Sequence, residues 1–549
     1  MKHNGNGMPG EDLTVAGYLI AQLEAWGVKR IYGVIGDANL RFLDELSRSS
    51  AIRYIACRHE GAAALMASAE AKLTGRIGVC LATSGPGAAN LVNGLADAAM
   101  DYAGVLAITG QVETSKHGTR TKQFVNQQLL MQALTDQSRE LVSGQALPEL
   151  LHGLLVQALL HGKAAHLSVA KDVWEQKLTG LPIPYGSYLH QPLLTPREAL
   201  EKAVEELSRA AKPVLYVGSG AGQVKEEVLS LAELLEAAVI TTLPARPLFP
   251  NDHPRYAGGL GQAGSEAATV LLRESDLILM LGATWWPDDY VPTQARLIQI
   301  DRSPANLAVG HPLLHGIVGD LADCLPELLA MVRRLPQADR AAWVRRTAGV
   351  TAEWNSQLLM EAARETHPLS PQMIMREIAD AAPPNAVIAV DTGDHTIWFN
   401  RIYQAKRDQT VLVSGRWRTL GFALPAAIAA KLAQPERPVL AIAGDGGSIQ
   451  TMMEFLTAVE HKLPLTVLIL NNASYAMEAN RMKKAGLAPL GSSIRNPDFP
   501  KLAEACGGAG ERTDSLTGLR EALQKASSSP VPFLIEVITA PEMAPHTKL

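Results

Sequence analysis

The residues best suited to chemistry follow two apolar strands in the last third of the chain. The segment PVLAIA, residues 438–443, runs into the turn GDGG, residues 444–447, and the segment LTVLIL, residues 465–470, ends at two asparagines, residues 471–472. We expect a helix between them, which makes one βαβ unit whose parallel strands end at the same edge of a sheet. That helix is predicted to place four apolar side chains on one face: Ile449, Met452, Met453 and Leu456.

Asp445 and Asn472 are expected to converge at that edge. Both offer oxygen ligands, which Mg²⁺ or Ca²⁺ requires beside a diphosphate, and the backbone carbonyl of Ser474 would complete the set. The glycines let main-chain N–H groups approach phosphate oxygens, and the following helix directs its positive end to the same place. Either piece alone would be an ordinary turn of an α/β protein, but their spacing inside one βαβ unit makes the combination specific.

This arrangement resembles the diphosphate and metal motif of the thiamine-diphosphate-dependent enzyme family. The resemblance extends over nearly the whole chain, and the order of its parts is that of the pyruvate oxidase and acetolactate synthase branch. It implies a pyrimidine-binding domain over residues 11–178, a middle Rossmann-like domain over 196–335 and a diphosphate-binding domain over 366–549. It also implies thiamine diphosphate and Mg²⁺ as cofactors, with the metal in the place predicted above.

A second motif, Arg58-His59-Glu60-Gly61, follows the strand IRYIAC and begins an alanine-rich helix. Taken alone, Glu60 would be a glutamate at a helix N-terminus, where the helix dipole favours it. The resemblance implies that Glu60 is the family's activating glutamate, which shares a proton with N1′ of the cofactor's aminopyrimidine. Burial in such a pocket would help the carboxyl group to keep its proton. His59 is expected to be structural.

The resemblance implies further cofactor contacts. The loop SGPG, residues 84–87, would lie near the pyrimidine ring, although by itself it indicates only a turn. After the strand VIAVD, Thr396 and the backbone are preferred to His395 as diphosphate contacts. Leu420 matches the aliphatic residue that bends the cofactor and brings its reacting groups together; without the resemblance it would be a core leucine. The predicted cofactor-binding residues are Gly85, Pro86, Gly393, Asp394, Thr396, Leu420, Gly444, Gly446, Gly447 and Met477.

Beside Glu60, the predicted catalytic residues are Lys122, Gln123 and Glu478. Members of the branch carry an aromatic residue before a glutamine in the loop over the reacting carbon, whereas here Lys122 precedes Gln123. Gln123 would hydrogen-bond the substrate, and Lys122 would either attract an acidic group on it or be a solvated loop residue. Glu478 falls where 2-oxoacid decarboxylases carry a catalytic glutamate, which favours proton transfer. The alternative is a surface glutamate on a helix.

The middle segment carries no specific nucleotide signature. PVLYVGSGAG, residues 213–222, is a strand with a glycine turn. Gln223 stands where a dinucleotide fingerprint has its third glycine, and no acidic residue follows the second strand, which argues against NAD. Relatives of this branch bind FAD in the middle domain, yet the segment GATWWPDDYVP lacks the basic residue that flavin-binding relatives often carry. FAD is left open as a cofactor.

Parallel sheets must hold these residues, and the chain has the pattern for three of them. Short apolar runs alternate with amphipathic helical stretches, which is typical of doubly wound parallel sheets, so the predicted fold class is α/β. We also predict a linker over residues 178–196, a helical connection over 341–366 and a mobile tail of ten residues at the N-terminus. The expected strands end near Val34, Cys57, Ala82, Thr109 and Ala170 in the first block, and comprise PVLYVGSG, AAVITTL, DLILMLG and RLIQID in the second and VIAVD, VLVSG, PVLAIAG, LTVLILN and FLIEVIT in the third.

Composition argues against several classes of protein. The 549 residues are 47% hydrophobic and 19% charged with a net charge of -5, which is typical of a globular protein of several domains. No basic cluster is dense enough for nucleic acid, and no apolar run reaches the ~18 residues that cross a bilayer. The cysteines are too dispersed for a zinc site or a disulfide framework, so we expect a cytoplasmic protein. They are Cys57, Cys80, Cys324 and Cys506.

The sequence therefore predicts an enzyme that decarboxylates a small, pyruvate-like 2-oxo acid. The resemblance implies a hydroxyalkyl-cofactor enamine, which an acetolactate synthase-like carboligase transfers and a decarboxylase protonates, so the enzyme would be a transferase or a lyase. The alternatives are an FAD-dependent pyruvate oxidase and a non-catalytic cofactor-binding subunit of the same fold. In the family the activating glutamate and the diphosphate site meet across a subunit boundary, which implies a homodimer or homotetramer.

Overall fold

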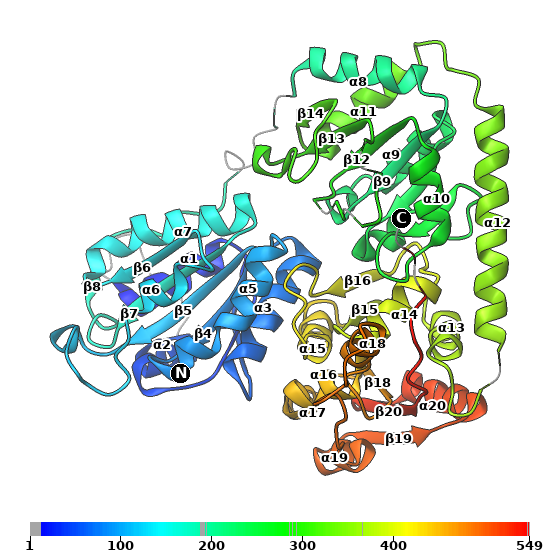
Figure 1. Cartoon of the computed structure of the whole chain (residues 1–549). Helices are drawn as coiled ribbons and strands as arrows, with labels where there is room; N and C mark the ends of the chain where they lie inside the picture. The colour runs from blue at the N-terminus through cyan, green and yellow to red at the C-terminus, as the bar shows by residue number, and fades with distance from the viewer. Residues whose placement is uncertain are drawn as a thin grey trace.

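Three six-stranded sheets, each built only of parallel strands, organise the chain (Figure 1). Helices cover both faces of every sheet, so the predicted fold class, three doubly wound α/β sheets, is confirmed. The predicted N-terminal tail and part of the predicted linker lie outside the described residues. The computed structural model describes residues 13–186, 193, 195–284, 286–287, 289–292, 294–364, 366–545 and 547.

The first sheet has the strand order β3-β2-β4-β5-β7-β6. Its inner strands β4, β5 and β7 are buried along their whole length, as expected for parallel strands covered on both faces. The strands are β2 (Arg30–Gly33), β3 (Arg53–Ala56), β4 (Gly78–Ala82), β5 (Val105–Gln111), β6 (Gln137–Leu141) and β7 (Ala164–Ala170), with a short antiparallel pair β1 (Leu13–Thr14) and β8 (Lys177–Leu178). The helices are α1 (Val15–Ala25), α2 (Leu40–Leu46), α3 (Glu60–Thr74), α4 (Pro86–Asn90), α5 (Val92–Met100), α6 (Gln127–Met131) and α7 (Leu147–His161).

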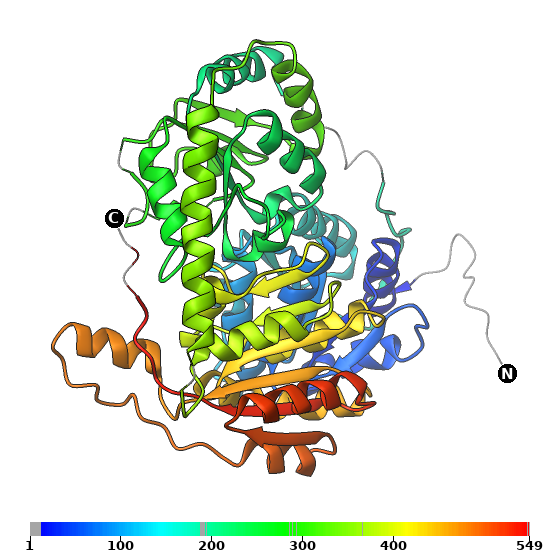
Figure 2. The ribbon, with the colours of Figure 1, turned by 90° about the vertical axis from the view of Figure 1, so that its right-hand side faces the viewer.

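The middle sheet has the strand order β11-β10-β9-β12-β13-β14. Its strands are β9 (Pro213–Val217), β10 (Ala238–Thr241), β11 (Tyr256–Gly259), β12 (Leu277–Leu281), β13 (Leu297–Asp301) and β14 (His315–Val318). Its helices are α8 (Arg197–Arg209), α9 (Lys225–Leu234), α10 (Glu266–Glu274) and α11 (Leu321–Val332). The predicted helical connection is the 23-residue helix α12 (Ala341–Ala363), which runs along the side of the middle and third domains (Figure 2).

The third sheet has the strand order β16-β15-β17-β18-β20-β19. Its strands are β15 (Val387–Val390), β16 (Thr410–Val413), β17 (Val439–Gly444), β18 (Thr466–Asn471), β19 (Ala509–Thr513) and β20 (Phe533–Ile538). Its helices are α13 (Pro371–Ala381), α14 (Asp394–Ile402), α15 (Ala423–Ala433), α16 (Asp445–Thr451), α17 (Phe455–Glu460), α18 (Ala476–Lys484), α19 (Phe499–Ala505) and α20 (Leu516–Ser528).

Two predictions about elements were incomplete or wrong. The sequence analysis missed strands β6, β11, β14 and β19, all of which lie at sheet edges. The single helix expected after GDGG is instead two helices, α16 and α17, joined by a 3₁₀ turn over Met452–Glu454. Its apolar residues do not share one buried face, because Met452 is buried while Ile449 and Met453 are 44% and 51% exposed.

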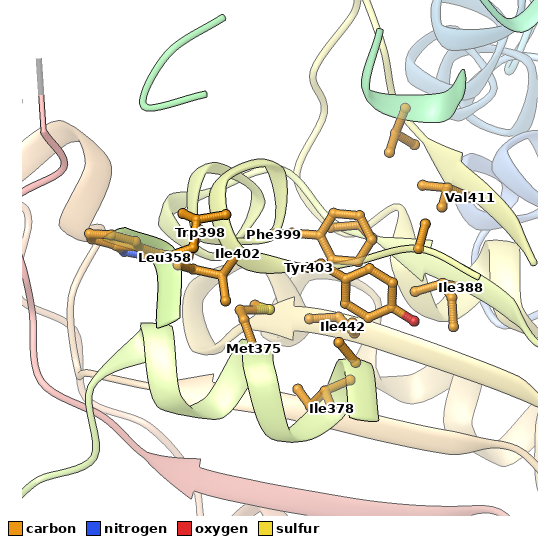
Figure 3. Close-up of a cluster of buried hydrophobic side chains, with 14 of the residues drawn as sticks. Leu358, Met375, Ile378, Ile388, Trp398, Phe399, Ile402, Tyr403, Val411 and Ile442 are labelled. Carbon is orange, nitrogen blue, oxygen red and sulfur yellow. The ribbon is translucent and has the colours of Figure 1, made fainter. Parts of the chain in front are cut away.

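The third domain packs against both others through apolar cores. One cluster joins it to the middle domain, and Figure 3 shows part of it, with the ring of Phe399 stacked on Tyr403 at 4.3 Å between centroids. A second cluster joins it to the first domain through α3 and α15, which are rich in alanine along their contact. Small side chains let the two helix backbones approach closely, and this close contact fixes the first domain against the third.

The described residues contain no helix that is both long and apolar enough to cross a membrane. All four cysteines are buried free thiols.

Candidate active site

Asp445 and Asn472 border one cavity at the carboxyl edge of the third sheet. Strands β17 and β18 are parallel neighbours with Gly444 opposite Leu470, so the residues that follow them emerge side by side. The cavity measures about 270 Å³, and both Asp445 and Asn472 line it together with Ser474. Among the described residues its walls come only from the third domain, between positions 371 and 539.

The oxygen atoms at this edge fit a divalent cation. Asp445 is buried, and its carboxylate accepts a hydrogen bond from Asn496 Nδ2 at 2.7 Å. Asn472 Oδ1 accepts the amide of Ser474 at 3.1 Å, which orders the turn that carries the Ser474 carbonyl. Burial raises the pKa of Asp445, and the hydrogen bond from Asn496 offsets part of that rise. A bound cation would favour the ionised carboxylate.

Asn496 is a site residue that the sequence analysis missed. Its Nδ2 also donates to Asn471 Oδ1 at 2.8 Å, while its Oδ1 is buried without a partner among the described residues. A buried oxygen that lacks a donor suits a place where a ligand or its water binds. In the described chain no group of three or more His, Cys, Asp or Glu side chains is arranged to hold a metal ion. A metal here would therefore rest on one carboxylate with amide and carbonyl oxygens, a set that suits Mg²⁺.

The GDGG turn needs its glycines because neighbouring groups lie close. A Cβ atom on Gly446 would lie 2.4 Å from the ring of Tyr475, and one on Gly447 would lie 3.1 Å from the carboxylate of Asp391. Gly444, Gly446 and Gly447 all line the cavity, so main-chain groups form that part of its wall. Such a wall can approach phosphate oxygens closely.

In the loop after β15, His395 lines the cavity and Thr396 does not. The Thr396 hydroxyl accepts the amide of Gly393 and donates to the carbonyl of Asp391, so it is used inside the loop and does not line the cavity. His395 lines the cavity, its Nε2 has no described partner, and burial lowers its pKa to about 4. Asp394 also lines the cavity, and burial raises its pKa to about 6.

Leu420, Met477 and Glu478 border the same cavity. The chain after Leu420 is fixed by Asp391, whose carboxylate accepts the amides of Gly421 and Phe422 at 3.1 and 3.3 Å. Glu478 is exposed at the cavity and forms an ion pair with Arg481 at 2.8 Å. The structure thus brings these three predicted residues to the cavity that Asp445, Asn472 and the GDGG turn border.

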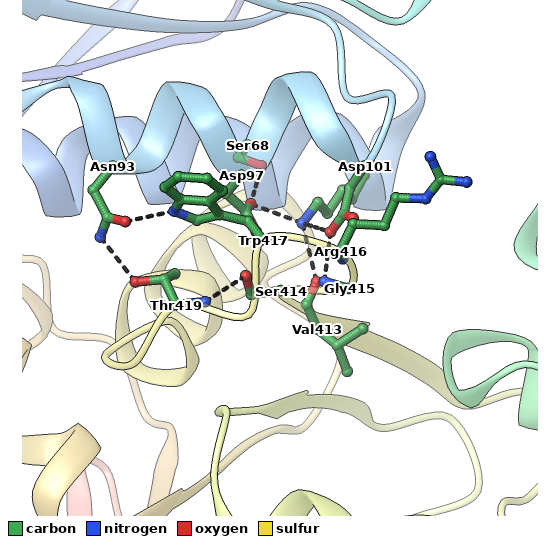
Figure 4. Close-up of polar contacts among 11 residues, drawn as sticks. Ser68, Asn93, Asp97, Asp101, Val413, Ser414, Gly415, Arg416, Trp417 and Thr419 are labelled. Atoms are coloured by element: carbon green, nitrogen blue, oxygen red, sulfur yellow. Dashed lines mark hydrogen bonds and ion pairs between the residues drawn. The ribbon is translucent and has the colours of Figure 1, made fainter. Parts of the chain in front are cut away.

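Side chains of the first domain hold the loop that carries Leu420 (Figure 4). The carboxylate of Asp101 accepts the amides of Gly415 and Arg416 at 2.6 and 2.8 Å. Asn93 accepts the indole N–H of Trp417 at 2.7 Å and donates to Thr419 at 2.9 Å. The loop is therefore positioned by Asn93 of α5 and by Asp101, which follows that helix, and not only by its own domain.

Glu60 belongs to a second group of predicted residues, which lies in the first domain and does not line the cavity. It is 9% exposed at the start of α3 and accepts a hydrogen bond from Asn90 at 2.9 Å. A Cβ atom on Gly87 would lie 3.2 Å from Glu60 Oε1, and one on Gly85 would lie 2.8 Å from the carbonyl of Gln123.

The structure therefore brings Glu60, the SGPG loop with Pro86 and the loop that carries Gln123 together. Gln123 has a φ of 64°, which is rare for a residue other than glycine and concentrates at functional sites. Lys122, beside it, is exposed.

The glycine turn of the middle domain is explained by packing alone. A Cβ atom on Gly218 would lie 2.3 Å from the carbonyl of Gly282, and one on Gly220 would lie 2.9 Å from the same carbonyl. The two turns after β9 and β12 pack backbone against backbone, which requires glycine without any nucleotide.

Comparison with known proteins gives matches to all three domains. Three family models match in order: the N-terminal TPP binding domain of thiamine pyrophosphate enzymes over residues 13–138, their central domain over 200–328 and their C-terminal TPP binding domain over 391–537. YdaP of Bacillus subtilis, whose name describes it as thiamine pyrophosphate-containing, is 36% identical over 95% of this chain and 90% of its own length. An acetolactate synthase of Mycobacterium bovis is 34% identical over 96% of this chain and 88% of its own. A pyruvate oxidase of Lactiplantibacillus plantarum is 29% identical over 97% and 89%.

Proposed function

Because this chain belongs to the thiamine pyrophosphate enzyme family, in the branch of acetolactate synthases and pyruvate oxidases, we propose that it decarboxylates a pyruvate-like 2-oxo acid. The observation that supports this most is the cavity that Asp445, Asn472 and Ser474 border together with Leu420 and Glu478. It combines oxygen ligands for a cation with an apolar wall and an acid beside the same space.

Asp445, Asn472 and the Ser474 carbonyl would hold Mg²⁺, and the GDGG backbone with His395 would hold the diphosphate. When bound, the cofactor supplies an electron sink for the pair left behind as CO₂ departs. Leu420 and Met477 exclude water from the reacting side of the cavity and orient what binds there. Glu478 would deliver or remove a proton at the reacting carbon.

Glu60 would hold the proton at N1′ of the pyrimidine, and we propose that a second copy of the chain supplies it. The cavity borders only third-domain residues, while Glu60, Gly85 and Gln123 form a separate group in the first domain. A homodimer is then the smallest active unit, and a homotetramer contains the same pair. The free thiols fit a reducing compartment, and we place the protein in the cytoplasm.

The experiment is CO₂ release from pyruvate by the purified protein with thiamine diphosphate and Mg²⁺. Glu60→Gln should fold normally and lose about 10²- to 10⁴-fold in rate. Glu149→Gln is the matched control, since Glu149 lies in the first turn of α7 and lines no part of the cavity. Unchanged turnover in Glu60→Gln would remove its role, and no turnover in the native protein with any 2-oxo acid would favour a non-catalytic cofactor-binding subunit.

Mixing two inactive variants tests the subunit boundary. Glu60→Gln and Asp445→Ala each damage a different half of the site. If the halves meet between copies, random hybrids contain one intact site, and the mixture should recover roughly a quarter of native activity. No recovery after subunit exchange would indicate that both halves act within one chain.

Two outcomes remain for the carbon fragment after CO₂ leaves. Glu478 at the cavity supports protonation or transfer to a second carbonyl compound, as in an acetolactate synthase. The pyruvate oxidase relative supports electron transfer through FAD. Against this, the close packing of Gly218 on Gly282 explains the glycine turn of the middle domain without a bound nucleotide. The visible spectrum of the purified protein shows whether a flavin is bound, because flavin absorbs there and thiamine diphosphate does not. Bleaching of that absorbance when the 2-oxo acid is added without oxygen would indicate electron transfer, and an absent or unbleached flavin would favour protonation or transfer to a second carbonyl compound.

A further inference from the structure

Arg418 lies in the Leu420 loop and, among the described residues, faces the cavity without a hydrogen-bond or ion-pair partner. Its neighbours in the loop are held by the first domain, where Asp101 accepts the amides of Gly415 and Arg416 and Asn93 accepts the indole N–H of Trp417 (Figure 4). Arg418 lines the cavity and is exposed at its mouth. Within the described chain no hydrogen bond or ion pair involves its guanidinium group, although arginine offers five donors.

The charges around Arg418 leave it without a counter-ion. Arg481 also lines the cavity, and its charge is already shared with Glu478 at 2.8 Å. Two other carboxylates line the cavity, Asp394 and Asp445, and neither of them acts on the pKa of Arg418. Desolvation lowers the pKa of Arg418, and the positive charge of Arg481 lowers it further. Among the described groups only Tyr290 opposes these two effects, and no carboxylate does.

The backbone at Arg418 is also held in an unusual conformation. Its φ is 55°, in the left-handed region that favours glycine. This region is unfavourable for arginine relative to glycine, and among the described residues no hydrogen bond or ion pair of the guanidinium group compensates for it. A guanidinium group maintained under these conditions suits recognition of a ligand anion.

We propose that Arg418 binds a second oxyanion on the substrate, so that the preferred 2-oxo acid is a dianion with a carboxylate, phosphonate or sulfonate at the end away from the ketone. This rests on the proposed function. The carboxylate that leaves as CO₂ is a less suitable partner for Arg418. Its negative charge is lost in the transition state, so a cation that binds it would stabilise the substrate more than the transition state and slow the reaction. An anionic group that stays on the substrate is bound equally well before and during CO₂ loss, so it strengthens binding without slowing the reaction.

The test compares kcat/KM for pyruvate, 2-oxobutyrate, 2-oxoglutarate and phosphonopyruvate in native protein and in Arg418→Met. Methionine has an unbranched side chain and, like arginine, is strained at a φ of 55°. The substitution therefore removes the charge without relieving the backbone strain. A charge-assisted contact predicts a fall of about 10- to 100-fold for the dianions and less than about threefold for the two monoanions. Arg418→Lys should restore part of the loss. Lys483→Met, on α18 but outside the cavity lining, controls for the change in net charge.

Calorimetry provides a readout that does not require turnover. With thiamine diphosphate and Mg²⁺ present, glutarate should bind native protein more tightly than butyrate, and Arg418→Met should remove that difference. An equal loss for all four substrates together with weaker thiamine diphosphate binding would overturn the proposal by assigning Arg418 to the cofactor. Weaker dimerisation with unchanged selectivity would overturn it by assigning Arg418 to the second copy. Absence of CO₂ from every 2-oxo acid would refute the proposed function, and the calorimetric comparison would still decide the role of Arg418.

Discussion

Replacing Lys72 by methionine should weaken the contact between the first and third domains. Lys72 Nζ lies 2.7 Å from Asp97, 2.8 Å from Asp101 and 3.0 Å from the carbonyl of Val413. It also lies 4.8 Å from the ring centroid of Phe422. One side chain thus connects α3 and α5 to the start of the Leu420 loop.

The size of the expected loss of stability follows from the burial of Asp97, the partner of Lys72. The side chain of Asp97 is 0% exposed, and its other described hydrogen bond comes from Ser68 at 2.6 Å. Removing Lys72 leaves an unpaired buried carboxylate, and breaking a buried ion pair in this way costs about 3–5 kcal/mol. Lys163→Met is the control, because its pair with Asp136 is long, at 3.8 Å, and exposed, so about 1 kcal/mol or less is expected.

The loss of stability in Lys72→Met should grow as the pH rises. Burial already raises the pKa of Asp97, and the attraction of Lys72 offsets part of that rise. Without Lys72 the folded state holds its proton at pH values where the unfolded aspartate, with a pKa of about 4, is ionised. The folded state then binds more protons, so its stability falls as pH rises above about 4.

Hydrogen exchange of α3 and α5 amides, corrected for the intrinsic rate at each pH, measures this local free energy. Adding Asp97→Asn to Lys72→Met removes the charge and should recover most of the loss and its pH dependence. A loss below about 1 kcal/mol, or one of the same size at pH 5 and pH 8, would refute the reasoning that Asp97 depends on Lys72.

Three further predictions concern residues around the cavity. Burial raises the pKa of Asp391 to about 7, so the folded state keeps a proton that the unfolded state loses near pH 4. The free energy of unfolding should therefore fall as the pH rises from about 4 to 7. Asp391→Asn should flatten this slope when unfolding by urea is measured at each pH. His395→Ala should raise the Kd of thiamine diphosphate about tenfold in a fluorescence titration, equally at pH 6 and pH 8, because the pKa of His395 is lowered to about 4 and it stays neutral. Asn496→Ala should raise the Mg²⁺ concentration for half-maximal activity about 10- to 100-fold, and an unchanged value would place Asn496 outside the metal site.

All the central strands were predictable from sequence, whereas of the six edge strands only β3 and β16 were. Strands such as β17 and β12 are continuous apolar runs because helices cover both of their faces. The edge strands β6 and β19, QSREL and AGERT, are only partly buried and carry charged residues, so neither period nor composition separates them from loops. The GDGG and Asn-Asn motifs were recognisable because neighbouring strands impose a fixed spacing on them.

Contacts that depend on tertiary packing left no such pattern. Asn496 lies 51 positions from Asp445, in a polar loop, and no spacing rule connects the two. The loop clamp of Asp101 on Gly415 joins residues 314 positions apart. His395 and Thr396 are adjacent in sequence, and only the internal hydrogen bonds of Thr396 show that its hydroxyl is already used.

Sequence order also does not reveal whether the two halves of the site meet within one chain. The amides of Arg58 and His59, just before Glu60, donate to Glu454 of the third domain at 2.9 and 3.0 Å. This contact and the packing of α3 on α15 fix where the start of α3 lies within the chain, and the cavity at GDGG borders no described residue of the first domain. The contact that stabilises one copy therefore holds Glu60 outside that copy's own cavity lining. A second copy is the simplest source of the missing carboxylate, and the mixed-variant experiment measures it directly.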